Sequence, residues 1–296
     1  MSKVLIIIVT FNGIDHIQNC LTPLRNLPAN MKCIMIDNGS TDGTIELVEK
    51  DFLFVELVKN AENLGFGAAN NIGLKRAIDE GFDYVYLLNQ DAWISPEDIQ
   101  KLIDISGKNP EYGIISPMQV YAGKNKIDDN FTGKITKEMK DDYFLSSNEP
   151  KDIYRIKRRG LQAAHWLMPT KVLRKTGGFS PTFYHYGEDD NLCRRVEFHG
   201  FKLGIAPNIL GVHNRENRKL TSTHQLLLNK NSLKKIASDP LLSDKEMWRS
   251  LLPEMFLIFL DSKFRFFPIL FHFIKNYPKI RRNRKISMNQ PGAFLR

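Results

Sequence analysis

Three consecutive carboxylates are the first candidates for chemistry in this chain. Glu188, Asp189 and Asp190 directly follow Gly187 and an aromatic cluster at residues 184–186. Adjacent like charges raise one another's pKa, which suits a general base that works near neutral pH. An acidic run would equally suit the N-terminus of a helix, where it complements the helix macrodipole. The residue types alone leave both interpretations open.

Asp91 and His213 are candidates for metal binding. Asp91 follows the apolar run Val85–Leu88, so its carboxylate is expected at the end of a strand. A hard oxygen ligand there could hold Mg²⁺ or Mn²⁺, which would bridge a substrate diphosphate. His213, beyond the turn Pro207-Asn208, could be a further ligand. A turn or helix-capping role for Asp91 and a surface position for His213 are the alternatives.

Polar side chains follow each of the strands expected in the first ninety residues. The loops concerned are Thr10-Phe11-Asn12, Asp37-Asn38, Asn60–Asn63 and Asn89-Gln90-Asp91. In an open α/β sheet, ligands bind outside the carboxyl ends of the strands. One strand that ends in Asp or Asn is common turn chemistry, but this series of polar ends predicts a shared binding cleft.

The elements that must position these loops alternate between strand and helix patterns, which predicts βαβ units and a mostly parallel sheet. Strands are expected at residues 4–9, 33–36, 54–59, 84–88, 113–121, 161–167 and 202–207. Ser40 or Thr41 could cap the helix that begins near Gly43, and Ser95 with Pro96 opens a later helix. The Lys/Asp-rich stretch 124–142 has few apolar anchors and is expected to form mobile loops or an edge hairpin.

Three function classes lack their usual motifs. The segment Asn63–Asn71 has Asn70 where a dinucleotide fingerprint needs its third glycine, and it follows the third strand instead of the first. The sequence contains neither a phosphate loop ending in Gly-Lys-Ser/Thr nor a Gly-x-Ser-x-Gly elbow. ATPase and serine-hydrolase activities therefore lose the residues that normally carry them.

The net charge of +9 originates at the C-terminal end of the chain. Nine Lys or Arg residues and no acid lie from Lys263 onward, which leaves 33 basic against 33 acidic residues before that point. A catalytic body that binds nucleic acid is therefore not expected. The three cysteines, Cys20, Cys33 and Cys193, have neither disulfide-framework nor zinc spacing, so a reducing compartment is expected.

Five motifs in order make the chain resemble family 2 glycosyltransferases of the GT-A fold, especially bacterial rhamnosyltransferase-like members. The resemblance extends over about residues 3–215. It implies an α/β fold with a Rossmann-like, mostly parallel sheet flanked by helices, and a C-terminal helical extension. The motifs are Val9–Gly13, Ile36–Gly43, Asn63–Asn70, Leu88–Asp91 and Gly178–Arg194.

The resemblance also implies a role for individual residues at the donor site. Asp37 would accept a hydrogen bond from a uracil or thymine imide. Asn89 stands where the family's Asp-x-Asp metal motif has its first Asp, which leaves Asp91, completed by His213, to bind Mg²⁺ or Mn²⁺. The residues implied in nucleotide-sugar binding are Thr10, Asn12, Asp37, Asn38, Asn63, Gly65, Asn70, Asn89 and Gln90.

At the acceptor side, the resemblance implies that Asp189 of the Glu188-Asp189 pair is the catalytic base. It would remove a proton from an acceptor hydroxyl, which attacks the sugar opposite the leaving diphosphate and inverts the anomeric centre. Trp166 would line the acceptor pocket, although the apolar strand around it favours a core position.

The implied activity is inverting transfer of a sugar from a dTDP- or UDP-sugar, with dTDP-rhamnose among the candidates. The acceptor would be a hydroxyl of a glycan or of a lipid-linked acceptor in cell-surface polysaccharide synthesis. A sugar nucleotidyltransferase would usually have a basic phosphate loop where Thr10–Gly13 stands. A catalytically inactive scaffold of the same fold is the other alternative, against which the combination of Asp91, Asp189 and His213 argues.

The C-terminal fifth of the chain lies outside the main resemblance. Residues 1–218 are expected to form the GT-A domain and residues 219–296 a helical, basic extension. The segment Leu251–Ile274 is too charged for a transmembrane helix.

Its aromatic and basic residues are similar to an interfacial element attracted to anionic lipid, which would make the protein cytoplasmic and peripheral on the inner face of the membrane. A helix pair that packs on the core or forms a homo-oligomer is the alternative. The residues concerned are Phe264, Phe266, Phe267, Phe271 and the run Arg281–Lys285.

Overall fold

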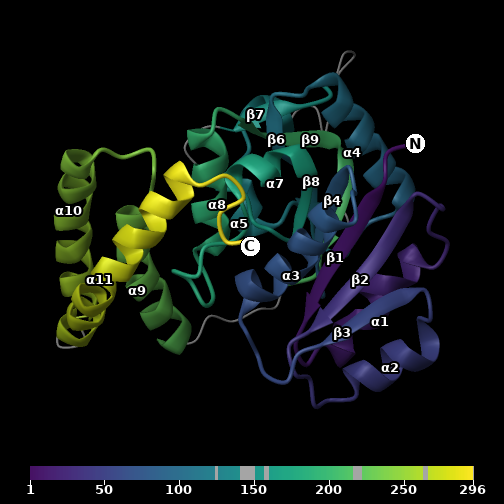
Figure 1. Cartoon of the computed structure of the whole chain (residues 1–296), viewed down its shortest axis with the longest axis horizontal. Coiled ribbons are helices and arrows are strands. Elements are labelled where there is room, and N and C mark those ends of the chain that lie inside the picture. Colours follow the sequence, from purple (N-terminus) through teal and green to yellow (C-terminus); the bar gives the residue numbers. More distant parts are fainter. Residues whose placement is uncertain (124–125, 141–150, 157–159, 216–221, 263–265, 296) are drawn as a thin grey trace.

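A computed structural model describes residues 1–123, 126–140, 151–156, 160–215, 222–262 and 266–295. In this part of the chain a nine-stranded mixed sheet has the order β3-β2-β1-β4-β8-β6-β9-β5, with β7 paired to β9 (Figure 1). The strands are β1 (Val4–Thr10), β2 (Met31–Asp37), β3 (Val55–Lys59), β4 (Tyr84–Asn89), β5 (Ala92–Trp93), β6 (Tyr112–Val120), β7 (Tyr154–Ile156), β8 (His165–Pro169) and β9 (Lys202–His213).

The parallel part of the sheet is formed by β3, β2, β1 and β4. In this register Thr10 pairs with Asp37, and Val9 with Asn89, so three of the polar loops predicted to converge begin side by side. The predicted α/β architecture is confirmed. It also explains why the loops meet, because parallel strands all end at the same edge of the sheet.

Helices cover both faces of the sheet. The apolar run of β1 alternates between them: Ile7 packs beneath α3 on one face, whereas Ile6 and Ile8 pack beneath α1 and α4 on the other. Strands buried on both faces read as continuous hydrophobic runs, which is the pattern that predicted β1. The helices are α1 (Ile14–Leu21), η1 (Thr22–Leu24), α2 (Thr44–Asp51), α3 (Phe66–Asp79), α4 (Pro96–Lys108), α5 (Asp129–Thr132), α7 (Thr170–Thr176) and α8 (Glu188–Phe198).

One of the two predicted helix caps is confirmed. The Ser95 hydroxyl accepts a hydrogen bond from the Asp98 amide at 3.1 Å and opens α4. At α2 the prediction was wrong, because Gly43 occupies the N-cap position and neither Ser40 nor Thr41 caps the helix. The Ser40 hydroxyl instead accepts a hydrogen bond from the Asn12 amide at 2.8 Å, which ties the loops after β1 and β2 together.

One strand boundary near the site differs from the sequence prediction. Strand β9 does not end near Pro207 but continues to His213, with extra residues accommodated where Ala206 and Leu210 pair with the consecutive residues Pro117 and Met118. The turn residues Pro207-Asn208 therefore form a bulge. His213 consequently lies at the end of a strand and not beyond one.

The stretch 124–142 was also predicted incorrectly where the structure describes it. Ile127, Phe131 and Met139 are buried in the main core, and Phe131 belongs to the short helix α5. Sparse apolar residues were enough to anchor the segment because each falls at a core position. Residues 124–125 and 141–142 lie outside the described residues.

The C-terminal helices α9 (Ser222–Ser238), α10 (Asp244–Ser262) and α11 (Phe266–Asn289) project from one side of the sheet domain (Figure 1). They share a hydrophobic cluster separate from those of the sheet, built around Leu233, Leu251 and Phe273. None of the described helices has the length and apolar character needed to cross a bilayer. The predicted helical extension is present.

Candidate active site

The ends of β1, β2 and β4 open into a cavity of about 470 Å³. Of the residues expected to bind the nucleotide-sugar, five line its wall: Asn38, Asn63, Gly65, Asn89 and Gln90. Asp91 lines it as well. The cavity is large enough for part of a nucleotide-sugar and brings together residues that lie far apart in sequence, from Val9 to Leu227.

Thr10 and Asn12 shape this cavity from outside its wall. The Thr10 hydroxyl donates a hydrogen bond to Gln90 Oε1 at 2.7 Å, and the Phe11 amide donates to the same oxygen at 2.9 Å. A Cβ at Gly13 would come within 2.7 Å of that oxygen, so a larger residue there would displace the Gln90 side chain. Asn12 Oδ1 accepts a hydrogen bond from the Thr41 amide at 2.9 Å.

Asp37 and Asn70 are both buried. Asp37 Oδ2 accepts hydrogen bonds from the Gly39 and Ser40 amides, each at 2.9 Å, whereas Oδ1 has no partner among the described residues. A buried carboxylate oxygen without a donor is costly unless something binds it, so Oδ1 is a candidate acceptor for a nucleobase. Asn70 donates to the Phe66 carbonyl at 2.9 Å and stabilises the first turns of α3.

Asp91 and His213 lie together, as the metal prediction required. Asp91 Oδ1 is 3.4 Å from His213 Nε2, because the short β5 that follows Asp91 pairs with the end of β9. Burial opposes ionisation of Asp91, but contact with His213 outweighs it and holds the pKa of this carboxyl below its usual value. The site thus presents an ionised carboxylate beside an imidazole.

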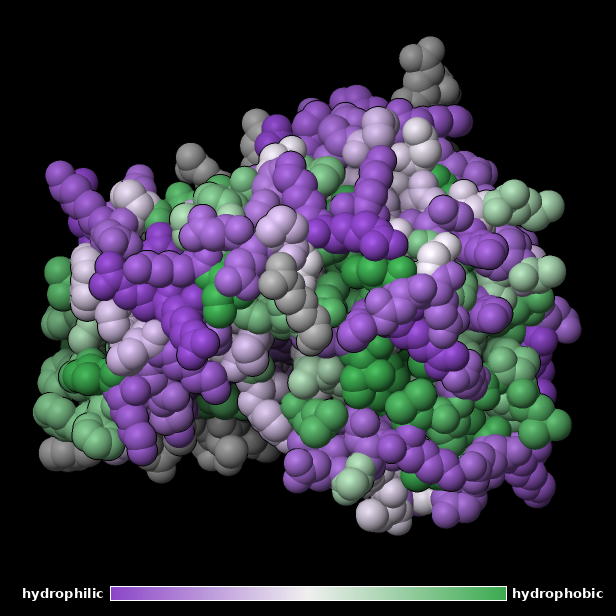
Figure 2. Space-filling model, viewed as in Figure 1, coloured by the Kyte–Doolittle hydropathy of each residue, from purple (hydrophilic) through white to green (hydrophobic). Residues whose placement is uncertain are grey.

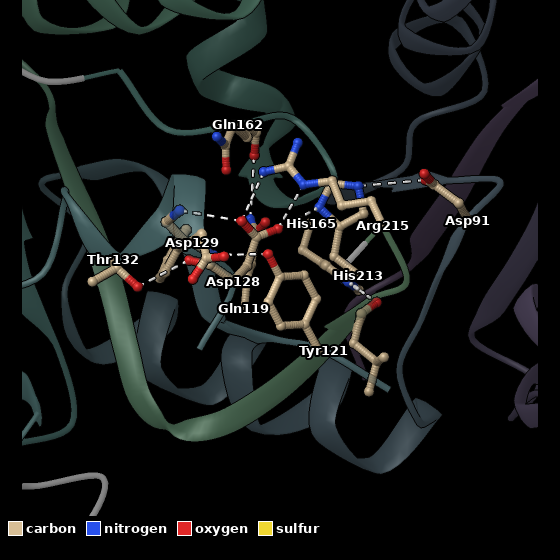
Figure 3. A network of polar contacts seen from close by, with 12 residues as sticks. Asp91, Gln119, Tyr121, Asp128, Asp129, Thr132, Gln162, His165, His213 and Arg215 are labelled. Carbon is tan, nitrogen blue, oxygen red and sulfur yellow. Dashed lines mark hydrogen bonds and ion pairs between the residues drawn. The ribbon is translucent and has the colours of Figure 1, made fainter. Parts of the chain in front are cut away.

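A buried network holds the other side of His213 (Figure 3). Asp128 Oδ2 lies 3.3 Å from His213 Nδ1, and the Asp128 carboxylate also accepts hydrogen bonds from Arg215 Nε at 2.7 Å and Nη2 at 2.9 Å. Asp128 is fully buried. Metal-binding histidines commonly have a carboxylate behind them that fixes the orientation of the ring, and Asp128 occupies that position here.

Sequence reasoning missed Asp128 and Arg215. Asp128 sits in the polar stretch that was expected to form loops, and no local pattern distinguishes it from its neighbour Asp129. Arg215 follows His213 by two residues, so a His-x-Arg spacing was the available signal. Only the fold brings the two together across 87 residues.

These residues fit a divalent cation held jointly with a substrate. With ligand distances of about 2.1 Å, neighbouring ligands of Mg²⁺ lie roughly 3 Å apart, close to the Asp91–His213 separation. Within the described residues no group of three or more His, Cys, Asp or Glu side chains forms a closed metal cage. Mg²⁺ is commonly bound by one or two side chains, waters and substrate phosphates, which is compatible with two protein ligands.

The acidic run opens helix α8 and borders a second cavity of about 540 Å³. Glu188, Asp189 and His213 line this cavity. It shares Phe66, Asn89 and His185 with the first cavity, so the two adjoin. The structure therefore supports both readings of the run, because the acids begin a helix and also face a cleft.

Both candidate acid–base residues have raised pKa values. Burial, followed by the charge of Asp190, raises the pKa of Asp189 to about 6. Burial, followed by the charge of Asp189, raises the pKa of Glu188 to about 8. A carboxylate with a pKa near 6 is still ionised at neutral pH and is a stronger base than an ordinary aspartate. Asp189 is therefore suited to proton removal, and Glu188 is protonated at that pH.

Trp166 does not line either cavity, contrary to its expected place beside the acceptor. Its side chain is fully buried in β8 and stacks on Phe179, with ring centroids 6.1 Å apart. Phe179 in turn packs edge-on against Phe66, at 5.8 Å, and Phe66 lines both cavities. Alternation along β8 turns Trp166 into the core, so it supports the cavity wall from behind.

Comparison with known proteins identifies the family of this chain. The family model for glycosyl transferase family 2 matches residues 5–164. N-acetylglucosaminyl-diphospho-decaprenol L-rhamnosyltransferase of Mycobacterium tuberculosis is 25% identical over 233 residues, which are 71% of this chain and 75% of the relative. An uncharacterized glycosyltransferase of Haemophilus influenzae is 33% identical over 114 residues, 37% of this chain and 44% of the relative.

Solved structures share the fold. The complex of S. aureus TarS with UDP-GlcNAc has a TM-score of 0.60 and 14% identity, and the match covers 97% of this chain and 84% of that one. The mannosyltransferase PcManGT of Pyrobaculum calidifontis, in complex with GDP-Man and Mn²⁺, has a TM-score of 0.57 and 15% identity, over 99% and 87% of the two chains. The fold is therefore GT-A-like. Because the family model matches more than half of the residues, this chain belongs to glycosyl transferase family 2 and is a nucleotide-sugar-dependent glycosyltransferase.

Proposed function

We propose that this chain is an inverting, divalent-metal-dependent glycosyltransferase of cell-surface polysaccharide synthesis. Its donor would be a dTDP- or UDP-sugar, with dTDP-rhamnose the first candidate, and its acceptor a hydroxyl of a glycan or lipid-linked glycan. The L-rhamnosyltransferase among its relatives, which is named for a diphospho-decaprenol acceptor, supports this donor and this acceptor class. The protein would then work inside the cell, at the inner face of the membrane.

One observation carries the proposal: the candidate base and the candidate metal ligands line adjoining cavities. Asp91 borders the first cavity, Asp189 the second, and the Asp91–His213 pair stands where they meet. A single displacement needs the base on one side of the anomeric carbon and the leaving diphosphate on the other. The two cavities provide those two sides.

Donor binding is assigned to the loops at the strand ends. Asn38, Asn63, Gly65, Asn89 and Gln90 would contact the nucleotide-sugar directly. Of the remaining proposed residues, Thr10, Asn12 and Asn70 would support the cavity wall through hydrogen bonds within the protein. Asp37 would bind the nucleobase through its buried Oδ1.

The reaction follows from these positions. Asp189 removes the proton of an acceptor hydroxyl, and the resulting oxygen nucleophile forms a bond to the anomeric carbon as the bond to the diphosphate oxygen breaks. Attack from the opposite face inverts the configuration. Asp91 and His213 would hold a divalent cation, which would neutralise charge on the departing diphosphate. Glu188, protonated beside Asp189, keeps a second negative charge away from the base.

The two alternatives have less support. Membership of a glycosyl transferase family counts against a sugar nucleotidyltransferase. An inactive scaffold would have no need to keep Asp189 facing a cleft or Asp91 in contact with His213. The combination of an available base and a metal-compatible pair favours an active enzyme.

A donor panel followed by product analysis tests the proposal. Thermal shifts with UDP- and dTDP-sugars, each with Mn²⁺ and with EDTA, identify the donor and the metal requirement. Proton NMR of the first-formed product then gives its anomeric configuration. A product that retains the donor configuration would exclude the single-displacement mechanism.

Asp189→Asn is expected to lower kcat by about 10²–10⁴-fold with donor binding nearly unchanged, because it removes only the base. Asp190→Asn is the matched control: it removes a neighbouring charge that pairs with Lys235 at 3.1 Å. If Asp190→Asn lost activity and Asp189→Asn kept it, the base would be misassigned.

A further inference from the structure

Exposed hydrophobic side chains concentrate on the hairpin of α10 and α11. More than half of the exposed large hydrophobic residues in the described chain fall between Trp248 and Ile274. In Figure 2 they appear as green atoms at the outer left end of the molecule, over α10 and the start of α11. We define the hairpin face as Leu252, Phe256, Leu257, Phe259, Leu260, Phe267, Phe271 and Ile274.

The hairpin face is distinct from the surface by which α10 and α11 pack on the rest of the protein. Leu251 and Ile258 of α10, with Ile269 and Phe273 of α11, are buried in the cluster shared with α9. The exposed phenylalanines lie on other sides of the same helices, and Phe271 is 70% exposed. A helix that is apolar on more than its buried side marks a binding surface, because soluble monomers seldom expose large contiguous apolar patches.

A group of lysines borders this face. Lys230 and Lys234 of α9 and Lys275 of α11 act together on His272: burial, followed by the charges of these lysines, lowers its pKa. Lys279 adds a further positive charge beside Lys234. Helix α11 contains no acid, and Asp261 of α10 accepts a hydrogen bond from Asn229 at 2.8 Å. Aromatic residues beside lysines match the chemistry of an anionic lipid surface.

The basic run Arg281–Lys285, which the sequence suggested as part of a lipid-binding element, lies in the second half of α11. Arg284 is buried and forms an ion pair with Asp244 at 3.0 Å, and Asn283 donates to Thr182 at 3.0 Å. These contacts fasten the second half of α11 to the rest of the protein. Phe264 lies outside the described residues. We therefore take the hairpin face with its lysines as the candidate lipid surface.

Helix α9 connects this face to the cleft. Its Leu228 and Lys235 line the second cavity, and its Leu227 lines the first. Asn231 Nδ2 donates to the carbonyls of His185 at 2.8 Å and Tyr186 at 2.7 Å. The helix that supports α10 and α11 thus also forms a wall of the candidate acceptor site.

We propose that the hairpin face inserts into the headgroup region of an anionic bilayer, with the lysines contacting lipid phosphates, and so presents the second cavity to a lipid-linked acceptor. For its acceptor, this inference rests on the proposed function. A second copy of the chain is a less suitable occupant, because face-to-face pairing would bring two groups of lysines together.

Vesicle flotation of the full chain tests the proposal without any need for activity. Wild-type protein is expected to float with vesicles of phosphatidylcholine and phosphatidylglycerol and to float less with phosphatidylcholine alone. Phe256→Ser with Phe271→Ser should lower the partition coefficient at least about tenfold. The matched control, Leu53→Ser with Leu241→Ser, removes two exposed leucines elsewhere and should leave flotation unchanged.

Three results would overturn the proposal. In the first, the wild-type protein floats with neither kind of vesicle. In the second, the control variant loses as much flotation as the phenylalanine variant. In the third, no vesicle binds, and the wild-type protein is a dimer that the phenylalanine substitutions, but not the control substitutions, convert to a monomer. The last result, read by light scattering, would make the face an interface between copies. A thermal shift with UDP and Mn²⁺ tests the donor site separately, so failure of either proposal is distinguishable.

Discussion

His213 is in contact with one carboxylate on each side of its ring. Asp91 faces Nε2 and the cleft, whereas Asp128, fastened by two hydrogen bonds from Arg215, faces Nδ1 from the interior. Burial opposes protonation of His213, but the two carboxylates outweigh it and raise its pKa. A divalent cation would replace that proton on Nε2 and leave Nδ1 directed at Asp128.

Asp128→Asn should therefore weaken metal binding even though Asp128 does not face the donor. We expect the affinity for Mn²⁺ in the presence of UDP to fall about 10–100-fold, as for other residues behind a metal ligand. Titration by electron paramagnetic resonance measures this without turnover. The matched control is Asp129→Asn, which removes an exposed neighbouring carboxylate. Equal Mn²⁺ affinity in both variants would remove the positioning role of Asp128.

The raised pKa of Asp189 predicts the acid side of the pH profile. Activity needs the ionised carboxylate, so kcat/KM should fall about tenfold per pH unit as the pH drops below about 6. The negative charge of Asp190 contributes to this raised value, and Asp190→Asn should move the limb to lower pH. Initial rates of both proteins measure this. If the acid side of the pH profile is the same in both, the assignment of Asp189 as the base is contradicted.

At the scale of elements, the site depends on contacts between loops that are distant in sequence. Gly65, at the N-terminus of α3, has a φ of 84° and lies directly against the backbone of Tyr184. The Tyr184 hydroxyl donates to the Asn63 carbonyl at 2.9 Å. The donor-side loop and the acceptor-side loop therefore support each other, with α9 behind the second one.

Gly65→Ala tests this contact, with Gly81→Ala as its matched control. Both positions have positive φ, so both variants incur backbone strain of about 1–3 kcal/mol. A Cβ at Gly81 meets open space, whereas one at Gly65 would clash with the Tyr184 carbonyl. We expect Gly65→Ala to lower the unfolding temperature further and to weaken UDP binding, measured by calorimetry. Identical effects of both substitutions would show that the loop contact is unimportant.

At the scale of the whole molecule, the C-terminal helices and the sheet domain are joined by several polar contacts. Asn191 of α8 donates to Ser238 Oγ at 3.1 Å, Arg194 pairs with Asp239 at 2.8 Å, and the Gly178 amide donates to the Ala293 carbonyl at 2.9 Å. The separate hydrophobic cluster of α9–α11 supports our proposal of a boundary near residue 218, a position outside the described residues.

Glu188 links the pH to the stability of the whole fold. Its folded pKa of about 8 exceeds the ordinary glutamate value of 4.5, so the folded protein binds more protons than the unfolded chain between these values. Its favourable contribution is therefore complete below about pH 4.5 and is lost as the pH rises through about 8.

Urea unfolding should be measured at low and at high pH. Between the two, the free energy of unfolding should fall by up to about a few kcal/mol more in the wild type than in Glu188→Gln, whose side chain stays neutral. Part of the dependence should remain in the variant, because Asp189 also has a raised pKa. A variant with the same dependence on pH as the wild type would contradict this prediction.

The sequence by itself determined the parallel strands and the polar loops after them. Val4–Val9 and Tyr84–Leu88 are continuous apolar runs, which is a local signal, and the rule that parallel strands end at one edge then brings Asn38, Asn89 and Asp91 to one cleft. The family motifs are also contiguous, and for the same reason the sequence was enough to propose Asp189 as the base.

Only the tertiary structure decided which distant groups meet. Asp128 reaches His213 because an otherwise polar segment packs into the core, and Trp166 turns away from the cleft because of the side on which it lies in β8. The bulge at Pro207-Asn208 extends β9 far enough to place His213 beside Asp91. These outcomes depend on packing between segments far apart in the chain, and no local pattern of residue types encodes such contacts.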